Sequence, residues 1–236
     1  MDSTILIKLS GESLANKQKS LAIDYELVRE IGSQLKEIQK LGHKILIVIG
    51  GGNFWRGTSA AKNGINRNTA DYIGMLGTVM NGLALESVFR DLGIKTRVLS
   101  SMGLDPRICE YFVREKAMKY LTDGKVLIFV GGTGRPFFTT DSAATLFASE
   151  MGANIILVGK NNVNGIFDSD PKVNPNAVRY DKITYDQVIE KNLKVMDSTA
   201  FSMARDNKIK LLIFDIKEKN SITKLIKGQT KHTEVY

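Results

Sequence analysis

The segment from Val126 to Asp141 constrains the fold more than any other part of the chain. It begins with the apolar run VLIFV, which is typical of a strand that is buried on both faces. Glycines end this run, and Thr140 or Asp141 is a suitable N-cap for the alanine-rich helix expected at 142–151. A strand, a glycine loop and a helix N-terminus in this order suit an anion. An ordinary βα turn has the same order, so this segment alone leaves both interpretations open.

Two other apolar runs, at 5–9 and 45–49, also lead into glycine turns, first at Ser10-Gly11 and then at three consecutive glycines, 50–52. Lys8 interrupts the first run near its end, and Arg56 follows the second. Because the carboxyl ends of parallel strands meet at one edge of a sheet, we expect the three turns and both cations to share one crevice. An edge-strand lysine and a surface ion pair are the alternative interpretations of the two cations.

Further apolar strands are expected at 96–99, 155–158 and 211–214, and helices alternate with the strands throughout. This alternation predicts an α/β fold with a mostly parallel sheet, forming a single domain, 1–236, of two lobes that meet near residue 150. Helices are expected from Asp24 to Gly42, from Thr69 or Asp71 to Gly93, and at 108–121, 197–204 and 220–226. Residues 58–68 are expected to be irregular, Asn164-Gly165 to form a hairpin turn, and the tail from Gly228 to be polar.

The composition excludes several classes of protein. Net charge is +8, which favours anionic ligands, but the basic residues are scattered, so nucleic acid is not expected as the main partner. The single cysteine, Cys109, excludes an intramolecular disulfide framework and a cysteine-based zinc site. Neither a signal peptide nor a stretch of transmembrane length is evident. His43 and His232 are interpreted as incidental.

Three familiar catalytic signatures are missing from the sequence. It contains no G-x-x-x-x-G-K-[ST], no complete G-x-G-x-x-G after a strand, and no Ser-His-Asp set. A P-loop kinase, a dinucleotide Rossmann site and acyl transfer are therefore not expected. The loop at 159–171, with amides, an aromatic residue and carboxylates, suits either a nucleoside or a hairpin. From the local sequence alone, Asp71 is interpreted as a charge that complements a helix dipole, and Asp197 is interpreted as an N-cap.

Several motifs taken together resemble those of the bacterial uridylate (UMP) kinases, which belong to the amino acid kinase superfamily. The resemblance covers residues 4–230, and the motifs are Lys8-Leu9-Ser10-Gly11-Glu12, Gly50-Gly51-Gly52-Asn53 with Arg56, Met80-Asn81-Gly82-Leu83-Ala84, Gly132-Thr133-Gly134 with PFFTTD at 136–141, and Lys194-Val195-Met196-Asp197. The resemblance implies a three-layer αβα sandwich with an acceptor (UMP) lobe at 1–150 and an ATP lobe at 151–236. It also implies reversible phosphoryl transfer from ATP to UMP, giving ADP and UDP, in pyrimidine nucleotide biosynthesis in the cytoplasm.

The same resemblance implies ligands and an assembly. Mg²⁺ would be carried by the nucleotide phosphates with no dedicated protein ligands, UTP would act as a feedback inhibitor, and the assembly would be a homohexamer, a trimer of dimers. The family's loop after KLSGE is often rich in glycine and linked to activation by GTP. The chain has no glycine at 16–21, so GTP activation is not expected.

The family's functional residues fall on three groups of positions. The catalytic residues would be Lys8, Arg56 and Asp141. ATP would contact Lys8, Leu9, Ser10, Gly11, Gly52, Arg56, Phe167, Asp170 and one of Asn161 and Asn162. UMP would contact Gly51, Asp71, Thr133, Gly134, Arg135, Pro136, Phe137, Phe138, Thr139 and Thr140. Arg135 stands where the family more often has asparagine, so its contact with the base stays open. For Asp197 the cap remains the favoured role.

Two competing functions follow from the same residues. The first is another kinase of the superfamily, one that phosphorylates an amino acid or carbamate. The second is a protein without catalytic activity that senses nucleotides or binds nucleic acid. A phosphate acceptor is already anionic at neutral pH and requires no general base, so charge neutralisation and positioning would supply most of the catalysis.

Overall fold

The computed structural model describes residues 3–16, 18–57, 64–171, 173–193 and 196–236. Three of the segments discussed in the sequence analysis include residues that lie outside the described ranges. They are Lys17 in the loop at 16–21, the irregular segment at 58–63, and Lys194 with Val195 in the last family motif.

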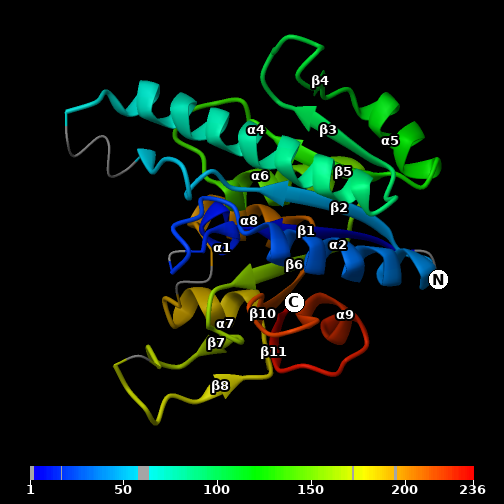
Figure 1. The fold of residues 1–236 in the computed structure, drawn as a ribbon. Coiled ribbons are helices and arrows are strands. Elements are labelled where there is room, and N and C mark those ends of the chain that lie inside the picture. The colour runs from blue at the N-terminus through cyan, green and yellow to red at the C-terminus, as the bar shows by residue number, and fades with distance from the viewer. Residues whose placement is uncertain (1–2, 17, 58–63, 172, 194–195) are drawn as a thin grey trace.

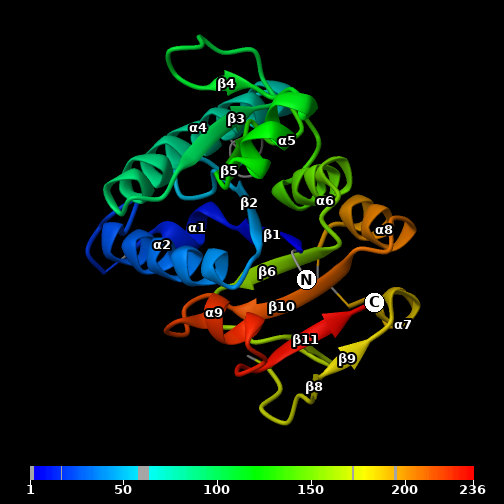
Figure 2. The same cartoon turned by 90° about the vertical axis from the view of Figure 1, so that its right-hand side faces the viewer.

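One nine-stranded sheet runs through the molecule in the order β4-β3-β5-β2-β1-β6-β10-β11-β9 (Figures 1 and 2). Only β10 and β11 pair antiparallel among its neighbours; the other pairs are parallel. The predicted α/β class with a mostly parallel sheet is confirmed. The strands are β1 Thr4–Leu9, β2 Lys44–Ile49, β3 Thr96–Ser100, β4 Glu110–Tyr111, β5 Val126–Val130, β6 Ile155–Lys160, β9 Lys182–Ile183, β10 Lys210–Asp215 and β11 His232–Val235.

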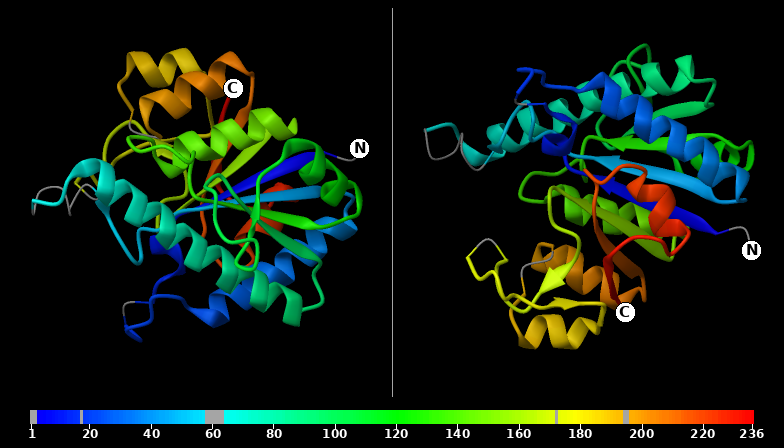
Figure 3. Two further views of the ribbon diagram at one scale, coloured as in Figure 1. Left: turned by 90° about the horizontal axis from the view of Figure 1, so that it is seen from above. Right: turned by 60° about the horizontal axis from the view of Figure 1, so that its bottom comes forward.

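Helices cover both faces of the sheet, as the view from above shows (Figure 3). One face packs against α2 (Tyr25–Lys40), α4 (Arg67–Asp91) and α9 (Ser221–Ile226). The other packs against α5 (Arg114–Thr122), α6 (Thr140–Met151), α7 (Tyr185–Glu190) and α8 (Ser198–Asp206). Each face has its own cluster of buried apolar side chains, which gives the three-layer arrangement.

The alternation of side chains along β1 places Lys8 on the face covered by α6. Leu6 joins the cluster beneath α6, whereas Ile7 and Leu9 join the cluster beneath α2 and α4. Because successive side chains of a strand point to opposite faces, Lys8 shares the face of Leu6. The charged end of this otherwise apolar strand therefore lies toward the first turn of α6.

Several helix ends follow from local capping, and some differ from the prediction. The side chain of Asp24 caps α2 as expected, and Gly42 follows the helix at φ +90°. Helix α4 begins earlier than expected, at Arg67, because the side chain of Asn66 accepts from the N–H of Asn68. The Ser10-Gly11 turn is the start of a short helix, α1 (Gly11–Leu14), which Ser10 caps.

The helix expected at 108–121 begins only at Arg114. Glu110 and Tyr111 form β4 on the outer edge of β3, and the ring of Phe112 packs edge-on against Phe129 at 5.5 Å between centroids. Aromatic and β-branched residues at 111–113 favour an extended backbone on a pleated surface over a helix. Tertiary contact with the sheet thus overrides the helical pattern.

One further expectation in the C-terminal part is wrong. Asn164-Gly165 is not the turn of a hairpin, because β7 (Ile166–Phe167) pairs with β8 (Arg179–Tyr180) and the loop between them follows Phe167. The tail from Gly228, expected only to be polar, contains the strand β11 at residues 232–235, in which Thr233 and Val235 are buried. The alternation of exposed and buried residues in HTEV matches a strand.

Helix α4 also overturns the expectation that no stretch reaches transmembrane length. It has 25 residues, and its most apolar window has a mean hydropathy of 1.2. Half of that window is buried inside the fold, where α4 contacts α2, β3 and β5. A buried core helix meets the same criterion of length and composition.

Candidate active site

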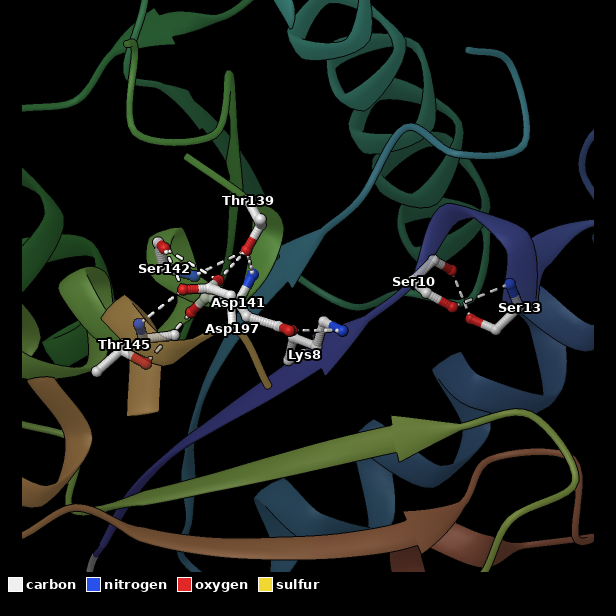
Figure 4. A network of polar contacts seen from close by, with 9 residues as sticks. Lys8, Ser10, Ser13, Thr139, Asp141, Ser142, Thr145 and Asp197 are labelled. Carbon is white, nitrogen blue, oxygen red and sulfur yellow. Dashed lines mark hydrogen bonds and ion pairs between the residues drawn. The ribbon is translucent and has the colours of Figure 1, made fainter. Parts of the chain in front are cut away.

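Lys8 and Asp141 form an ion pair at the carboxyl end of the sheet. The Nζ of Lys8 lies 2.7 Å from Oδ1 of Asp141, and the two side chains are 8% and 17% exposed (Figure 4). Lys8 comes from β1 and Asp141 from the first turn of α6. In so little water, these charges act strongly on any anion that approaches them.

Hydrogen bonds at the N-terminus of α6 fix the position of Asp141. The helix is capped by Thr139, whose Oγ1 accepts from the N–H groups of Asp141 (3.0 Å) and Ser142 (3.4 Å). The expectation that Thr140 or Asp141 caps this helix is therefore wrong by one or two positions. Because Thr139 supplies the cap, the carboxylate of Asp141 is directed at Lys8 instead of at its own helix.

Asp197 ties this helix start to α8. Its carboxylate accepts from the hydroxyl of Thr139 and from the hydroxyl of Ser142, the latter at 3.1 Å (Figure 4). It also accepts from the N–H of Ala200 at 2.9 Å and so caps α8, as the sequence predicts. One carboxylate thus joins two helices beside the Lys8–Asp141 pair.

The glycine turns after β1 and β2 lie against each other and against the start of α6. A Cβ atom on Gly11 would stand 2.6 Å from the backbone N of Gly52 and 2.7 Å from the carbonyl O of Gly50. A Cβ on Gly50 would stand 3.1 Å from Oγ1 of Thr140. Only glycine allows so close an approach of two main chains at Gly11.

A hollow of about 370 Å³ opens beside these turns. Its walls include eight residues predicted for the site, which are Gly51, Gly52, Arg56, Asp71, Arg135, Phe138, Thr139 and Thr140, and also Gly132 from the third glycine turn. Glu12, Trp55, Gly57, Gly74, Met75 and Thr78 complete the lining, whereas the predicted Thr133, Gly134, Pro136 and Phe137 are not part of it. The three glycine turns therefore meet at one edge of the sheet.

Asp71 lies beyond the first turn of α4, which has no acidic residue, so it is not placed to complement the helix dipole as the local sequence suggests. Both its oxygens accept from Nε of Arg67 at 2.8 Å, and Oδ2 also accepts from the N–H of Phe137 at 2.8 Å. The Phe137 backbone has φ +71°, and its ring lies 5.7 Å from the guanidinium of Arg67. Asp71 consequently holds the loop after β5 against α4 at the mouth of the hollow.

Arg56 reaches the same hollow from the loop after β2. Its Nη2 lies 2.5 Å from Oε1 of Glu12, and both side chains are about half exposed. This contact is the surface ion pair that formed the alternative interpretation of Arg56. Because the pair lines the hollow, an anion that enters competes with Glu12 for the guanidinium.

A second hollow, of about 570 Å³, lies at the ends of β6 and β7. Phe167 and Asp170, predicted for ATP, line it together with Lys160 and Lys191. Asn161 and Asn162 do not line it. Among the described residues, Oδ1 of Asn161 is buried with no hydrogen-bond partner, whereas the N–H of Asn162 donates to Asp215 at 3.0 Å. The side-chain oxygen of Asn161 is thus a buried acceptor without a partner.

The family model described as the Amino acid kinase family matches residues 3–215. The chain belongs to the amino acid kinase family. Uridylate kinase from Mesomycoplasma hyopneumoniae strain 7448 is 94% identical over 236 residues, which is 100% of both chains. Uridylate kinase from Mycoplasmopsis pulmonis is 61% identical over 235 residues, covering 100% of this chain and 97% of that one.

Solved structures of the family have the same architecture. UMP kinase from Ureaplasma parvum superposes with a TM-score of 0.95 at 41% identity, covering 100% of this chain and 99% of that one. UMP kinase from Bacillus anthracis gives a TM-score of 0.93 at 37% identity, over 99% and 95%. The resemblance inferred from the sequence motifs is thus confirmed, together with the fold.

Three residues of this family member were missed in the sequence, namely Glu12, Arg67 and Lys160. Glu12 and Arg67 pair with Arg56 and Asp71, and such pairings are not visible in a sequence. Lys160 carried a usable signal, because it ends an apolar strand as Lys8 nearly does. Burial lowers the pKa of Lys160 below its ordinary value, the charge of Lys8 lowers it further, and Asp141 acts in the opposite direction.

Proposed function

We propose that the chain is a uridylate kinase that transfers the γ-phosphoryl group of ATP to UMP, giving ADP and UDP. The observation that carries this proposal is the full-length likeness, at 94% identity, to a relative named uridylate kinase. The geometry agrees with it. Lys8, which pairs with Asp141 of α6, stands on β1 between β2 and β6, whose ends lead to the two hollows.

The two hollows receive the two nucleotides in this proposal. UMP occupies the hollow with Gly51 and Asp71, beneath the loop at 133–140, which belongs to the acceptor lobe at 1–150. The adenosine of ATP occupies the hollow with Phe167 and Asp170, in the lobe at 151–236. Its phosphates then extend over β1 toward Lys8, Ser10 and Gly11, where Gly52 and Arg56 complete the binding site.

The chemistry required of these residues is mainly electrostatic. The attacking oxygen of UMP is already anionic, so repulsion between two polyanions is the obstacle. Lys8 neutralises charge on the transferring group, and Asp141 holds the lysine in place from the first turn of α6. Hollows on either side of the pair bring the nucleotides in line.

Mg²⁺ accompanies ATP in this proposal and neutralises phosphate charge. Within the part of the chain that the structure describes, no group of three or more His, Cys, Asp or Glu side chains is placed to hold a metal ion. Mg²⁺ commonly binds through substrate phosphates and one or two carboxylates, so the single Asp141 carboxylate beside the phosphate path fits such an ion.

The chain assembles as a homohexamer, a trimer of dimers, in this proposal, and an apolar stripe on α4 supports contact between copies. Tyr72, Leu76 and Met80 succeed one another at intervals of four residues and are 39%, 46% and 48% exposed. Residues so spaced share one helix face, and a second copy of the chain would bury it. In this proposal the enzyme acts in the cytoplasm, in pyrimidine nucleotide biosynthesis, and UTP inhibits it.

A coupled assay of ADP release with a panel of acceptors tests the function. UMP, CMP and dUMP are compared with acetylglutamate, aspartate and carbamate, each with ATP and Mg²⁺. UMP should be the preferred acceptor, and phosphorylation of a carboxylate or carbamate but not of UMP would overturn the proposal. Salt-dependent DNA binding without UDP formation would favour a protein without catalytic activity instead.

A further inference from the structure

We propose that Lys160 is a further catalytic residue, which contacts the phosphates of ATP between the adenosine hollow and Lys8. The inference rests on the proposed kinase function and extends it to a residue for which neither the sequence motifs nor the predicted site accounts. It is carried by the position of Lys160 in the sheet, by the hollow that it lines and by the charges around it.

The register of the sheet places Lys160 near the catalytic pair. Strand β6 lies directly beside β1 (Figure 2), and Val158 is the partner of Lys8. Lys160 is two residues further along the same parallel strand, so its side chain leaves the same face of the sheet as Lys8, about 7 Å closer to the carboxyl edge. That face is the one that α6 covers with Asp141 in its first turn.

Lys160 also forms part of the wall of the second hollow. The residue lines it together with Phe167 and Asp170, the positions proposed for adenosine. In the proposed binding mode, a nucleotide whose base lies among these residues passes Lys160 before its terminal phosphates reach Lys8. The side chain therefore stands where the phosphate chain crosses from β6 to β1.

The electrostatic surroundings agree with an anion at this place. Burial and the positive charge of Lys8 both lower the pKa of Lys160, and only the charge of Asp141 opposes them among the named charges. A half-buried lysine beside another lysine gains most from a ligand that brings negative charge. ATP supplies that charge at neutral pH.

The role of Lys160 in the transfer follows from the charge balance. The bond between the γ-phosphorus and the β–γ bridging oxygen breaks, and a bond from the γ-phosphorus to an oxygen of UMP forms. The electron pair of the broken bond stays on ADP, and no proton is transferred. Negative charge thus accumulates on the β-phosphate, where Lys160 stabilises it.

Lys160→Met tests this role, because it keeps the length and removes the charge. Lys160→Arg is the conservative variant. Lys44→Met is the control, because Lys44 is the first residue of β2, at the end of the strand that lies away from the site, and the change removes the same charge. We expect kcat/KM for ATP to fall on the order of 10-fold or more in Lys160→Met. Lys160→Arg should recover much of the loss, and Lys44→Met should match the unaltered chain.

Calorimetric binding of ADP and of adenosine separates phosphate contact from pocket structure. Lys160→Met should weaken ADP about 10-fold and leave adenosine nearly unchanged. Equal losses for the two ligands, or an unchanged affinity for ADP, would overturn the proposal. Should Lys160→Met fail to fold, Lys160→Gln is subjected to the same two titrations. If the unaltered chain bound ADP but did not phosphorylate UMP, the proposed function would fail while the test of Lys160 still stood.

Discussion

The N-cap residues of two different helices are hydrogen-bonded to each other, since the hydroxyl of Thr139, which caps α6, donates to the carboxylate of Asp197, which caps α8. The same carboxylate accepts from Ser142 and from the N–H of Ala200. This contact sets where α6 begins and therefore where Asp141 meets Lys8.

Asp197→Ala should destabilise the fold and slow catalysis. It removes the cap of α8 and leaves the hydroxyls of Thr139 and Ser142 without their acceptor, at a cost of about 1–3 kcal/mol. Urea unfolding measures the loss, and Asp206→Ala, at the exposed end of the same helix, is the control. Equal stability of the two variants would show that the contact contributes nothing.

Asp71→Ala should chiefly raise KM for UMP, by about 10-fold or more, because the carboxylate holds the loop at Phe137 as well as facing the acceptor hollow. Steady-state kinetics with UMP varied at saturating ATP measure this effect. Asp91→Ala, at the other end of α4, is the control. A change confined to KM for ATP would mean that the two hollows have been assigned to the wrong nucleotides.

Arg56→Ala should lower kcat and raise KM for the nucleotides without loss of stability. Its pair with Glu12 is about half exposed on both sides, and such pairs contribute about 0–1 kcal/mol. Thermal unfolding and initial rates, measured on the same preparation, separate the two effects. Unchanged kinetics in a folded variant would leave Arg56 as a surface residue only.

Asp24→Ala should cost about 1 kcal/mol at neutral pH, as does loss of other N-caps. The side-chain amide of Asn16, 2.7 Å away, and then the N–H groups of Leu27 and Glu26 hold the pKa of Asp24 below its ordinary value of 3.8, although burial opposes them. Since the folded pKa is the lower one, this stabilisation is present above about pH 4 and is lost as pH falls through the folded value. The free energies of unfolding of the unaltered chain and of Asp24→Ala, measured at several pH values, should therefore approach each other in acid. A difference that stays constant with pH would contradict this role of Asp24.

The sequence predicts the sheet, and the position of Lys8 at its carboxyl edge, well because both follow from strong local signals. A lysine within an apolar strand and glycines at strand ends are costly unless a ligand site requires them, and they indicate Lys8 and the turns around Gly11 and Gly50. The motif resemblance adds Asp141, which reads by itself as a possible cap.

What the sequence does not predict depends on partners distant along the chain. Strand β11 exists because β10 offers a free edge, and Phe112 leaves the helical pattern because Phe129 and Phe147 surround its ring. The bonds of Asp71 with Arg67 and Phe137 likewise depend on how α4 packs. Asn164-Gly165 has the composition of a hairpin turn, yet β7 finds its partner only at Arg179 and Tyr180.

The most direct test of the account is the rate of UDP formation in a single turnover by the unaltered chain and by Lys8→Ala. In the proposed function, the ion pair with Asp141 holds the ammonium group of Lys8 for the transferring phosphoryl group. The variant should therefore form UDP slower by on the order of 100-fold or more, while UMP binding is retained. UDP formed at the rate of the unaltered chain would contradict the account, because the pair on which it is built would then have no part in the transfer.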